Sequence, residues 1–158
     1  MDSNPKSPAS RPRILLVEDE PVIALALEST LRELGFDVVA TAARISSALE
    51  AARRQTIDYA ILDVNLGAQR VDAVADVLAA RGCPFFFMTG YGTSDLPPRH
   101  ADRAVLQKPF RLEQLFAVLR AEFGLLGDGS GESEEDSPAY RNRRVKPRPP
   151  SGVPTSGP

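Results

Sequence analysis

Short, continuously apolar runs alternate with stretches of helical periodicity between residues 13 and 124. The runs are typical of buried strands and predict strands at 14–17, 37–41, 59–62, 85–88 and 104–106. Apolar residues that recur every three or four positions predict helices at 21–34, 45–52, 71–78 and 112–123. Because the strands are apolar throughout rather than at every second position, the pattern favours a mostly parallel sheet covered by helices on both faces.

Prolines and glycines mark where these elements begin and end. Pro21 suits the first turn of a helix, and Gly35 and Gly82 suit the left-handed position that follows a helix end. Residues 90–98 contain two glycines and two prolines, a composition that interrupts a regular helix. We therefore expect a loop with at most a short helical turn where a fourth helix would otherwise stand.

Composition separates this core from its flanks. Half of the residues in 127–158 are Pro, Gly or Ser, and residues 1–12 include three prolines. We expect segments 1–12 and 125–158 to be disordered on either side of one domain that spans 13–124. The basic stretch at 141–148 is interpreted as a solubilising tail balanced by the acidic stretch at 132–136, with contact to nucleic acid or an acidic partner as the alternative.

Several classes of protein do not fit this sequence. No apolar run approaches the roughly 18–20 residues that span a bilayer, and residues 1–12 lack the apolar stretch of a secretory signal. One cysteine, Cys83, and one histidine, His100, argue against a disulfide framework, a zinc site and a Ser-His-Asp triad. We expect a cytoplasmic protein in which Cys83 is a buried thiol and His100 lies in a solvated loop.

The core is mildly acidic, and some of its polar side chains stand where the predicted strands end. It has 12 basic and 15 acidic residues, so it is a poor candidate for non-specific DNA binding. In a doubly wound sheet, ligands bind at the carboxyl ends of the strands. The polar residues at these ends are Glu18, Asp19, Asp63, Thr89 and Lys108.

Convergence of these side chains would favour a metal ion and phosphoryl transfer. Carboxylates within a few ångströms of one another repel by roughly 4 kcal/mol per close pair, and a hard divalent cation such as Mg²⁺ offsets that repulsion. A carboxylate held beside Mg²⁺, an ammonium and a hydroxyl is suited to accept a phosphoryl group, because the cations neutralise the transferring oxygens.

In this order and at these strand ends, the residues resemble the active site of response-regulator receiver domains of the CheY-like superfamily. The matching motifs are Leu-Val-Glu-Asp-Glu, Ile-Leu-Asp-Val-Asn-Leu, Phe-Met-Thr-Gly-Tyr and Gln-Lys-Pro-Phe, and the resemblance covers residues 13–123. It implies a doubly wound, flavodoxin-like α/β fold whose five parallel strands have the order 2-1-3-4-5. The fourth helix would be short or absent.

The resemblance assigns the acidic residues to metal binding and phosphoryl transfer. Asp63 would accept a phosphoryl group from a sensor histidine kinase or a histidine phosphotransfer protein. Asp19, Asp63 and the backbone carbonyl of Asn65 would hold Mg²⁺, and Glu18 would act through water. The protein would be a signalling component rather than an enzyme, apart from its own phosphorylation and autodephosphorylation.

The resemblance also assigns the residues around the acceptor. Lys108 would pair with the phosphoryl oxygens, and the peptide bond between Lys108 and Pro109 would be cis. Thr89 would supply the switch hydroxyl. Gly90 would leave space for the phosphoryl group. Tyr91 would tune the lifetime of the phosphoaspartate together with Asn65, either as a mobile, partner-facing switch or as a plain surface aromatic.

Two departures from the common family pattern bear on signalling. Val105 stands three residues before the lysine, where many receivers have a Tyr or Phe that rotates on phosphorylation. The run Phe87 to Tyr91 is similar to the FAT GUY subgroup of receivers, which have a poorly formed fourth helix and are largely stand-alone regulators. Met88 replaces the alanine of that motif.

The sequence therefore predicts a single-domain response regulator of two-component or phosphorelay signalling, with a protein as its downstream target and without a DNA-binding domain. A phosphorylation-independent interaction module is the alternative, and an intact acidic cluster argues against it. An aspartyl-phosphate phosphatase would need a second carboxylate two residues after the acceptor. Asn65 stands there instead.

Overall fold

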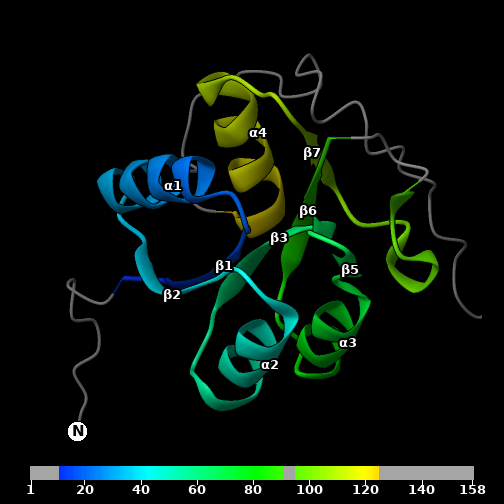
Figure 1. The fold of residues 1–158 in the computed structure, drawn as a ribbon. Coiled ribbons are helices and arrows are strands. Elements are labelled where there is room, and N and C mark those ends of the chain that lie inside the picture. Colours follow the sequence, from blue (N-terminus) through cyan, green and yellow to red (C-terminus); the bar gives the residue numbers. More distant parts are fainter. Residues whose placement is uncertain (1–10, 91–94, 125–158) are drawn as a thin grey trace, which may run out of the picture.

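The computed structural model describes residues 11–90 and 95–124 and contains a five-stranded parallel sheet (Figure 1). The strands lie in the order β2-β1-β3-β6-β7, which is 2-1-3-4-5 when the strands of this sheet are counted along the chain. The predicted flavodoxin-like fold is confirmed. The strands of this sheet are β1 (Arg13–Val17), β2 (Asp37–Ala42), β3 (Tyr59–Asp63), β6 (Phe85–Thr89) and β7 (Val105–Gln107).

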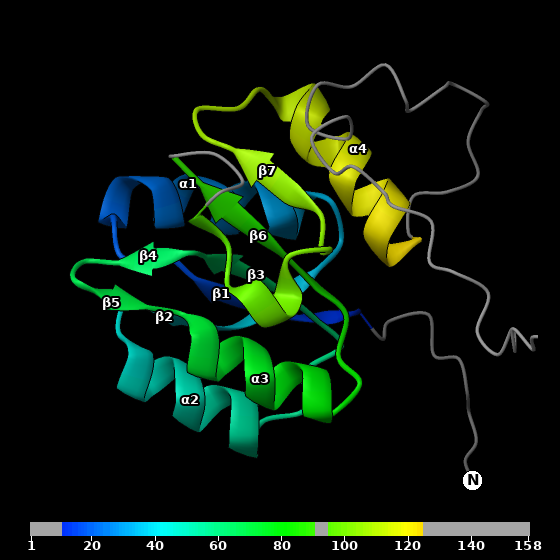
Figure 2. The same cartoon turned by 90° about the vertical axis from the view of Figure 1, so that its right-hand side faces the viewer.

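The described residues form four α-helices, which cover the two faces of the sheet (Figures 1 and 2). On one face lie α1 (Pro21–Glu33) and α4 (Leu112–Phe123), and on the other lie α2 (Ile45–Arg54) and α3 (Asp72–Ala80). Each strand therefore contributes apolar side chains to two separate cores, one against each pair of helices. This burial on both faces explains why the strands are apolar at consecutive positions.

The predicted helix boundaries agree with the structure where proline and glycine fix the backbone. Pro21 is the first residue of α1. Gly35 and Gly82 follow α1 and α3 with φ angles of +101° and +72°, which glycine adopts without the steric cost of a Cβ atom.

A short antiparallel hairpin between β3 and α3 is an element that sequence analysis did not predict. It pairs β4 (Asn65–Leu66) with β5 (Gln69–Arg70), and Gly67 turns the chain with a φ of +60°. Two residues per strand are too few to produce a periodic pattern. The only local signal in the sequence was Gly67, since glycine is common in tight turns.

The segment from 95 to 104 contains a three-residue 3-10 helix, Pro98–His100, and no longer helix among its described residues. The prediction of a short or absent fourth helix is confirmed to that extent. The predicted position of His100 in a solvated loop is wrong. Its side chain is buried because its ring packs edge-on against Phe85 and its Nε2 lies 2.8 Å from Asp76 Oδ1 on α3.

Other predictions are settled in part or fall on residues that the structure does not describe. Cys83 is buried, as predicted. The flanking segments 1–10 and 125–158 and the side chain of Tyr91 lie outside the described residues. Within the described part of the chain, none of the helices has the length and apolar character needed to cross a bilayer.

Candidate functional site

The parallel register of the sheet brings the five predicted site residues to one edge. Glu18 and Asp19 follow β1, and Asp63 and Thr89 are the last residues of β3 and β6. Lys108 follows β7, and its backbone N–H donates to the carbonyl oxygen of Thr89 at 2.8 Å. Three of these side chains are polar yet buried, which is unusual enough to indicate a built site: Glu18, Asp63 and Thr89.

Lys108 connects two of the buried carboxylates. Its Nζ donates to Glu18 Oε1 at 3.0 Å and to Asp63 Oδ2 at 3.0 Å. Burial of the ammonium opposes its charge, but the hydrogen bonds and charges of Asp63 and Glu18 outweigh that effect and raise the pKa of Lys108. The lysine is therefore held as a cation next to the proposed acceptor.

Burial acts in the opposite direction on the carboxyl groups. Loss of hydration raises the pKa of Glu18 to about 6, and the negative charge of Asp63 adds to the rise. Burial also raises the pKa of Asp63, against the lowering effect of Lys108 and of the Asn65 backbone N–H, which donates to Asp63 Oδ1 at 3.3 Å. One ammonium thus compensates only part of the negative charge gathered here.

This uncompensated charge fits a divalent cation. Glu18, Asp19 and Asp63 each offer a carboxylate oxygen, and these oxygens lie within 4.8 Å of one another. Hard oxygen donors in such a cluster are the ligands that Mg²⁺ prefers. The residues present therefore fit the metal that the sequence predicts.

The site opens into a cavity of about 520 Å³. A Cβ atom built on Gly90 would meet none of the described atoms within 4 Å, in agreement with the predicted space beside the acceptor. The peptide bond between Lys108 and Pro109 is cis, as predicted. The cavity is lined by Asp19, Glu20, Ile23, Asp63, Asn65, Gly67, Gly90, Lys108 and Pro109.

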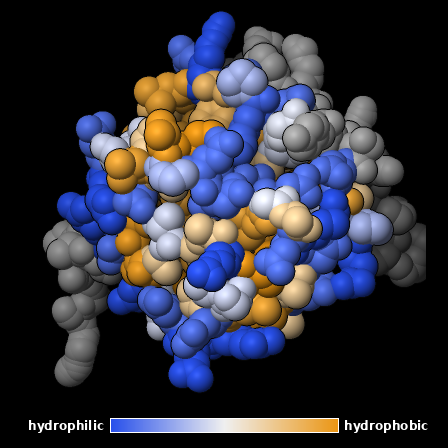
Figure 3. Space-filling view, in the orientation of Figure 1, coloured by the Kyte–Doolittle hydropathy of each residue, from blue (hydrophilic) through white to orange (hydrophobic). Residues whose placement is uncertain are grey.

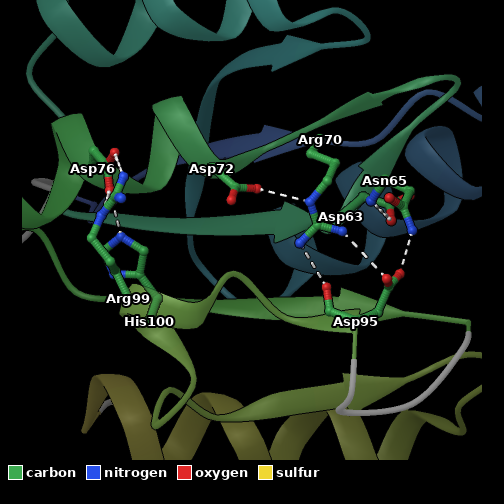
Figure 4. Close-up of polar contacts among 8 residues, drawn as sticks. All are labelled: Asp63, Asn65, Arg70, Asp72, Asp76, Asp95, Arg99 and His100. Atoms are coloured by element: carbon green, nitrogen blue, oxygen red, sulfur yellow. Dashed lines mark hydrogen bonds and ion pairs between the residues drawn. The ribbon is translucent and has the colours of Figure 1, made fainter.

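The structure adds residues that sequence analysis did not associate with the site. The Asn65 side chain donates to the carboxylate of Asp95, and Arg70 of the hairpin contacts both Asp95 and Asp72 (Figure 4). No sequence signal marked Asp95, because it lies in an irregular segment, 32 positions after Asp63, without apolar periodicity.

The predicted switch positions differ in how far the structure describes them. Val105 is buried in the core between the sheet and helices α2 and α3, where its small aliphatic side chain has no ring to rotate. Thr89 is buried at the end of β6. Tyr91 lies outside the described residues, so its role stays a prediction.

Comparisons with known proteins agree with this geometry. The family model of the response regulator receiver domain matches residues 14–120. The transcriptional regulatory protein PdtaR of Mycobacterium tuberculosis is 32% identical over 111 residues, which cover 68% of this chain and 54% of PdtaR. The chain thus spans about half the length of this relative. A probable chemotaxis protein CheY of Rhizobium etli is 29% identical over 127 residues, which cover 75% of this chain and 97% of that protein.

Solved structures show the same likeness. SdrG from Sphingomonas melonis Fr1 has a TM-score of 0.63 and 44% identity, over 70% of this chain and 95% of SdrG. Its BeF3-activated conformation has a TM-score of 0.60, over 69% of this chain and 93% of that one. The PhyR receiver domain of Erythrobacter litoralis has a TM-score of 0.63 and 27% identity, over 80% of this chain and all of that domain. With the fold, the acidic cluster and the lysine in place, this chain belongs to the response regulator receiver domain family.

Proposed function

We propose that Asp63 accepts a phosphoryl group from a phosphohistidine on a sensor kinase or a histidine phosphotransfer protein. The observation that carries the proposal is the contact of the Lys108 ammonium with both Glu18 and Asp63 at the floor of an open cavity. The acceptor is thus buried enough to exclude bulk water, yet it stays accessible from one side.

In the transfer, a carboxylate oxygen of Asp63 attacks phosphorus while the bond from phosphorus to the donor imidazole nitrogen breaks. The imidazole leaves with the electron pair of that bond and takes up a proton. Lys108 lies close enough to Asp63 to pair with the transferring oxygens, and the Thr89 hydroxyl is the further donor that we assign to them. Gly90 leaves the space that the phosphoryl group needs.

Asp19, Asp63 and the backbone carbonyl of Asn65 are the groups that would hold Mg²⁺, with Glu18 acting through water. Bound there, Mg²⁺ supplies positive charge that offsets the negative charge of the phosphoryl oxygens. A relative at 44% identity has a BeF3-activated conformation, and beryllofluoride resembles a phosphoryl group in shape and charge. That likeness supports an acceptor role and disfavours the phosphorylation-independent alternative.

An apolar groove beside the acceptor cavity suggests where the donor protein binds. It lies between α1 and the start of α4, has a volume of about 320 Å³, and shares Ile23, Lys108 and Pro109 with the acceptor cavity. Hydrophobic surface gathers over these two helices (Figure 3). Two of the most exposed large apolar side chains in the described residues line this groove: Val22 and Leu112, which are 79% and 49% exposed.

We assign this groove to a helix that carries the donor phosphohistidine, because the groove runs directly into the acceptor cavity. A helix with apolar residues on one face would bury Val22 and Leu112 and would present its histidine above Asp63. The described part of the chain offers no covering element for these side chains. The kinase and the downstream protein target are the partners that we propose for this chain.

Phosphotransfer from a phosphorylated kinase domain tests both parts of the proposal. We expect wild type to take the label and Asp63→Asn to take none. Val22→Lys is expected to slow transfer from the kinase, because a buried ammonium opposes docking. Ser46→Lys, which adds the same single charge on the exposed side of α2, is the matched control and is expected to transfer normally.

The outcomes test the acceptor role of Asp63 and the assignment of the groove separately. Failure of wild type to accept label from any phosphohistidine donor or from acetyl phosphate would contradict the acceptor role. Equal slowing of Val22→Lys with the kinase and with acetyl phosphate would contradict the docking assignment alone, since acetyl phosphate needs no helix in the groove.

A further inference from the structure

Asp95 lies after the switch residue Thr89 in the chain and contacts the hairpin next to the acceptor. Its carboxylate Oδ2 accepts a hydrogen bond from Asn65 Nδ2 at 2.6 Å (Figure 4). Arg70 holds the same residue through two further hydrogen bonds, from Nη1 to Asp95 Oδ1 at 3.3 Å and from Nη2 to the Asp95 carbonyl oxygen at 2.8 Å. Asp95 is therefore fixed in place on three of its oxygen atoms.

Asn65 joins this cluster to the chemistry. Its backbone N–H donates to Asp63 Oδ1 at 3.3 Å, and the residue lines the acceptor cavity. One residue thus contacts the acceptor through its main chain and Asp95 through its side chain. The hydrogen bond to Asp95 is short and charge-assisted, and such bonds hold a side chain more firmly than neutral ones.

We propose that Asp95 is a positioning residue that shortens the lifetime of phosphorylated Asp63 by fixing the orientation of the Asn65 amide. The proposal rests on the proposed acceptor function. Because the amide donates through Nδ2 to Asp95, its carbonyl Oδ1 is left as the end that meets the cavity water. Asn65 then orients a water molecule rather than stabilising the phosphoryl oxygens with its N–H groups.

The reaction that Asn65 would affect is the hydrolysis of phosphorylated Asp63. A water oxygen forms a bond to phosphorus while the bond from phosphorus to the Asp63 oxygen breaks. Asp63 leaves as a carboxylate, and both water protons leave with the product, dihydrogen phosphate. The Asn65 carbonyl accepts a hydrogen bond from the attacking water and takes no proton, so its contribution is orientation.

Arg70 ties Asp95 to the hairpin and to the start of α3. Its Nε lies 3.2 Å from Asp72 Oδ1 at the start of α3, and its other two nitrogens donate to Asp95. The guanidinium partly neutralises Asp95 and keeps it on the hairpin. Without Asp95, the Asn65 amide is free to turn and to donate an N–H to a phosphoryl oxygen, which stabilises the phosphoaspartate instead of its hydrolysis.

The test is the decay of phosphorylated protein after removal of acetyl phosphate, followed by intact mass for variants whose folding is checked by thermal unfolding. Asp95→Ala is expected to lengthen the half-life roughly fivefold. Asp95→Asn keeps an oxygen that accepts from Asn65 and is expected to retain most of the wild-type rate. In an Asn65→Ala background, Asp95→Ala is expected to have no further effect.

Arg99→Ala is the control for loosening the same segment elsewhere, because Arg99 pairs with Asp76 on α3, away from Asn65. We expect its half-life to equal that of wild type. An unchanged half-life for Asp95→Ala would overturn the proposal, as would an effect that persists without the Asn65 side chain or an Asp95→Asn variant as slow as Asp95→Ala. A wild type that gains no phosphoryl group at all would instead overturn the acceptor function.

Discussion

Lys108 lies between two buried carboxylates, with its ammonium 3.0 Å from Glu18 and 3.0 Å from Asp63. Neither carboxylate is well hydrated, so the lysine provides the nearest compensation for their charge. The residue that we assign to phosphoryl binding therefore also stabilises the fold before any phosphorylation. This dual role gives a stability prediction at the scale of one residue.

Lys108→Ala is expected to lower the free energy of unfolding by about 3 kcal/mol, because it leaves two buried carboxylates without their cation. Urea unfolding in the presence of a chelator measures the change. Arg53→Ala on the exposed surface of α2 is the control, and it is expected to change stability by less than about 0.5 kcal/mol. A Lys108→Ala protein as stable as wild type would contradict the charge balance described here.

Cys83 shows what burial does to a single thiol. It is 7% exposed, and burial raises its pKa to about 11, with the Asp58 charge as a smaller contribution. At pH 8 the folded protein is therefore expected to react with a thiol reagent many times more slowly than the unfolded chain, because both access and thiolate are limited. Absorbance with a disulfide reagent, with and without urea, checks this, and equal rates would contradict it.

At the scale of elements, α4 is held on the sheet by aromatic contacts near its end. The Phe123 ring stacks on Tyr59 with centroids 4.2 Å apart and lies 5.4 Å from the Phe86 ring. The Tyr59 hydroxyl also donates to the Phe123 carbonyl at 3.3 Å. These contacts hold the last turn of α4 against the start of β3.

Phe123→Ala is expected to lower the free energy of unfolding by about 3–4 kcal/mol, because it removes a buried ring and leaves a cavity. Leu112→Ala, at the exposed start of the same helix, is the matched control and is expected to cost less than about 1 kcal/mol. Chemical denaturation of both variants gives the comparison. Equal losses would show that α4 is not anchored through Phe123.

The sequence was informative for elements whose pattern is local. The strand that ends at Asp63 is apolar at each preceding position from 60 to 62, and both of its faces are buried, so its prediction needed no tertiary information. The hairpin at 65–70 has two-residue strands, which are shorter than one period of any pattern. It could be found only from the pairing of the folded chain.

The site residues also divide into those with a local sequence signal and those that depend on tertiary contacts. Asp63, Thr89 and Lys108 were predictable because strand ends of a parallel sheet meet at one edge. The contacts of Asp95 depend on where an irregular segment crosses the hairpin, and no spacing rule describes that. His100 was misplaced because its charged neighbours suggested solvent, whereas Asp76 and Phe85 enclose it in the fold.

At the scale of the whole molecule, the fold gathers negative charge at one end of the sheet. Glu18, Asp19 and Asp63 converge there from β1 and β3, and apolar cores above and below the sheet hold those strands in place. The global stability is thus expected to depend on whether a cation is bound, because binding to the folded state alone stabilises it.

Mg²⁺ is expected to raise the melting temperature of wild type, and a chelator is expected to reverse the rise. Asp19→Asn removes one of the repelling charges, so it is expected to melt slightly higher than wild type without Mg²⁺ and to respond little when Mg²⁺ is added. Differential scanning fluorimetry over a Mg²⁺ titration measures both effects. An undiminished response in Asp19→Asn would place the cation elsewhere.

The central claim is that Asp63 is a Mg²⁺-dependent phosphoryl acceptor. Intact mass after incubation with acetyl phosphate, with and without Mg²⁺, tests it most directly in wild type and Asp63→Asn. We expect a gain of one phosphoryl group in wild type with Mg²⁺ and no gain in either the metal-free sample or the variant. An equal gain in Asp63→Asn, or no gain in wild type with any donor, would contradict it.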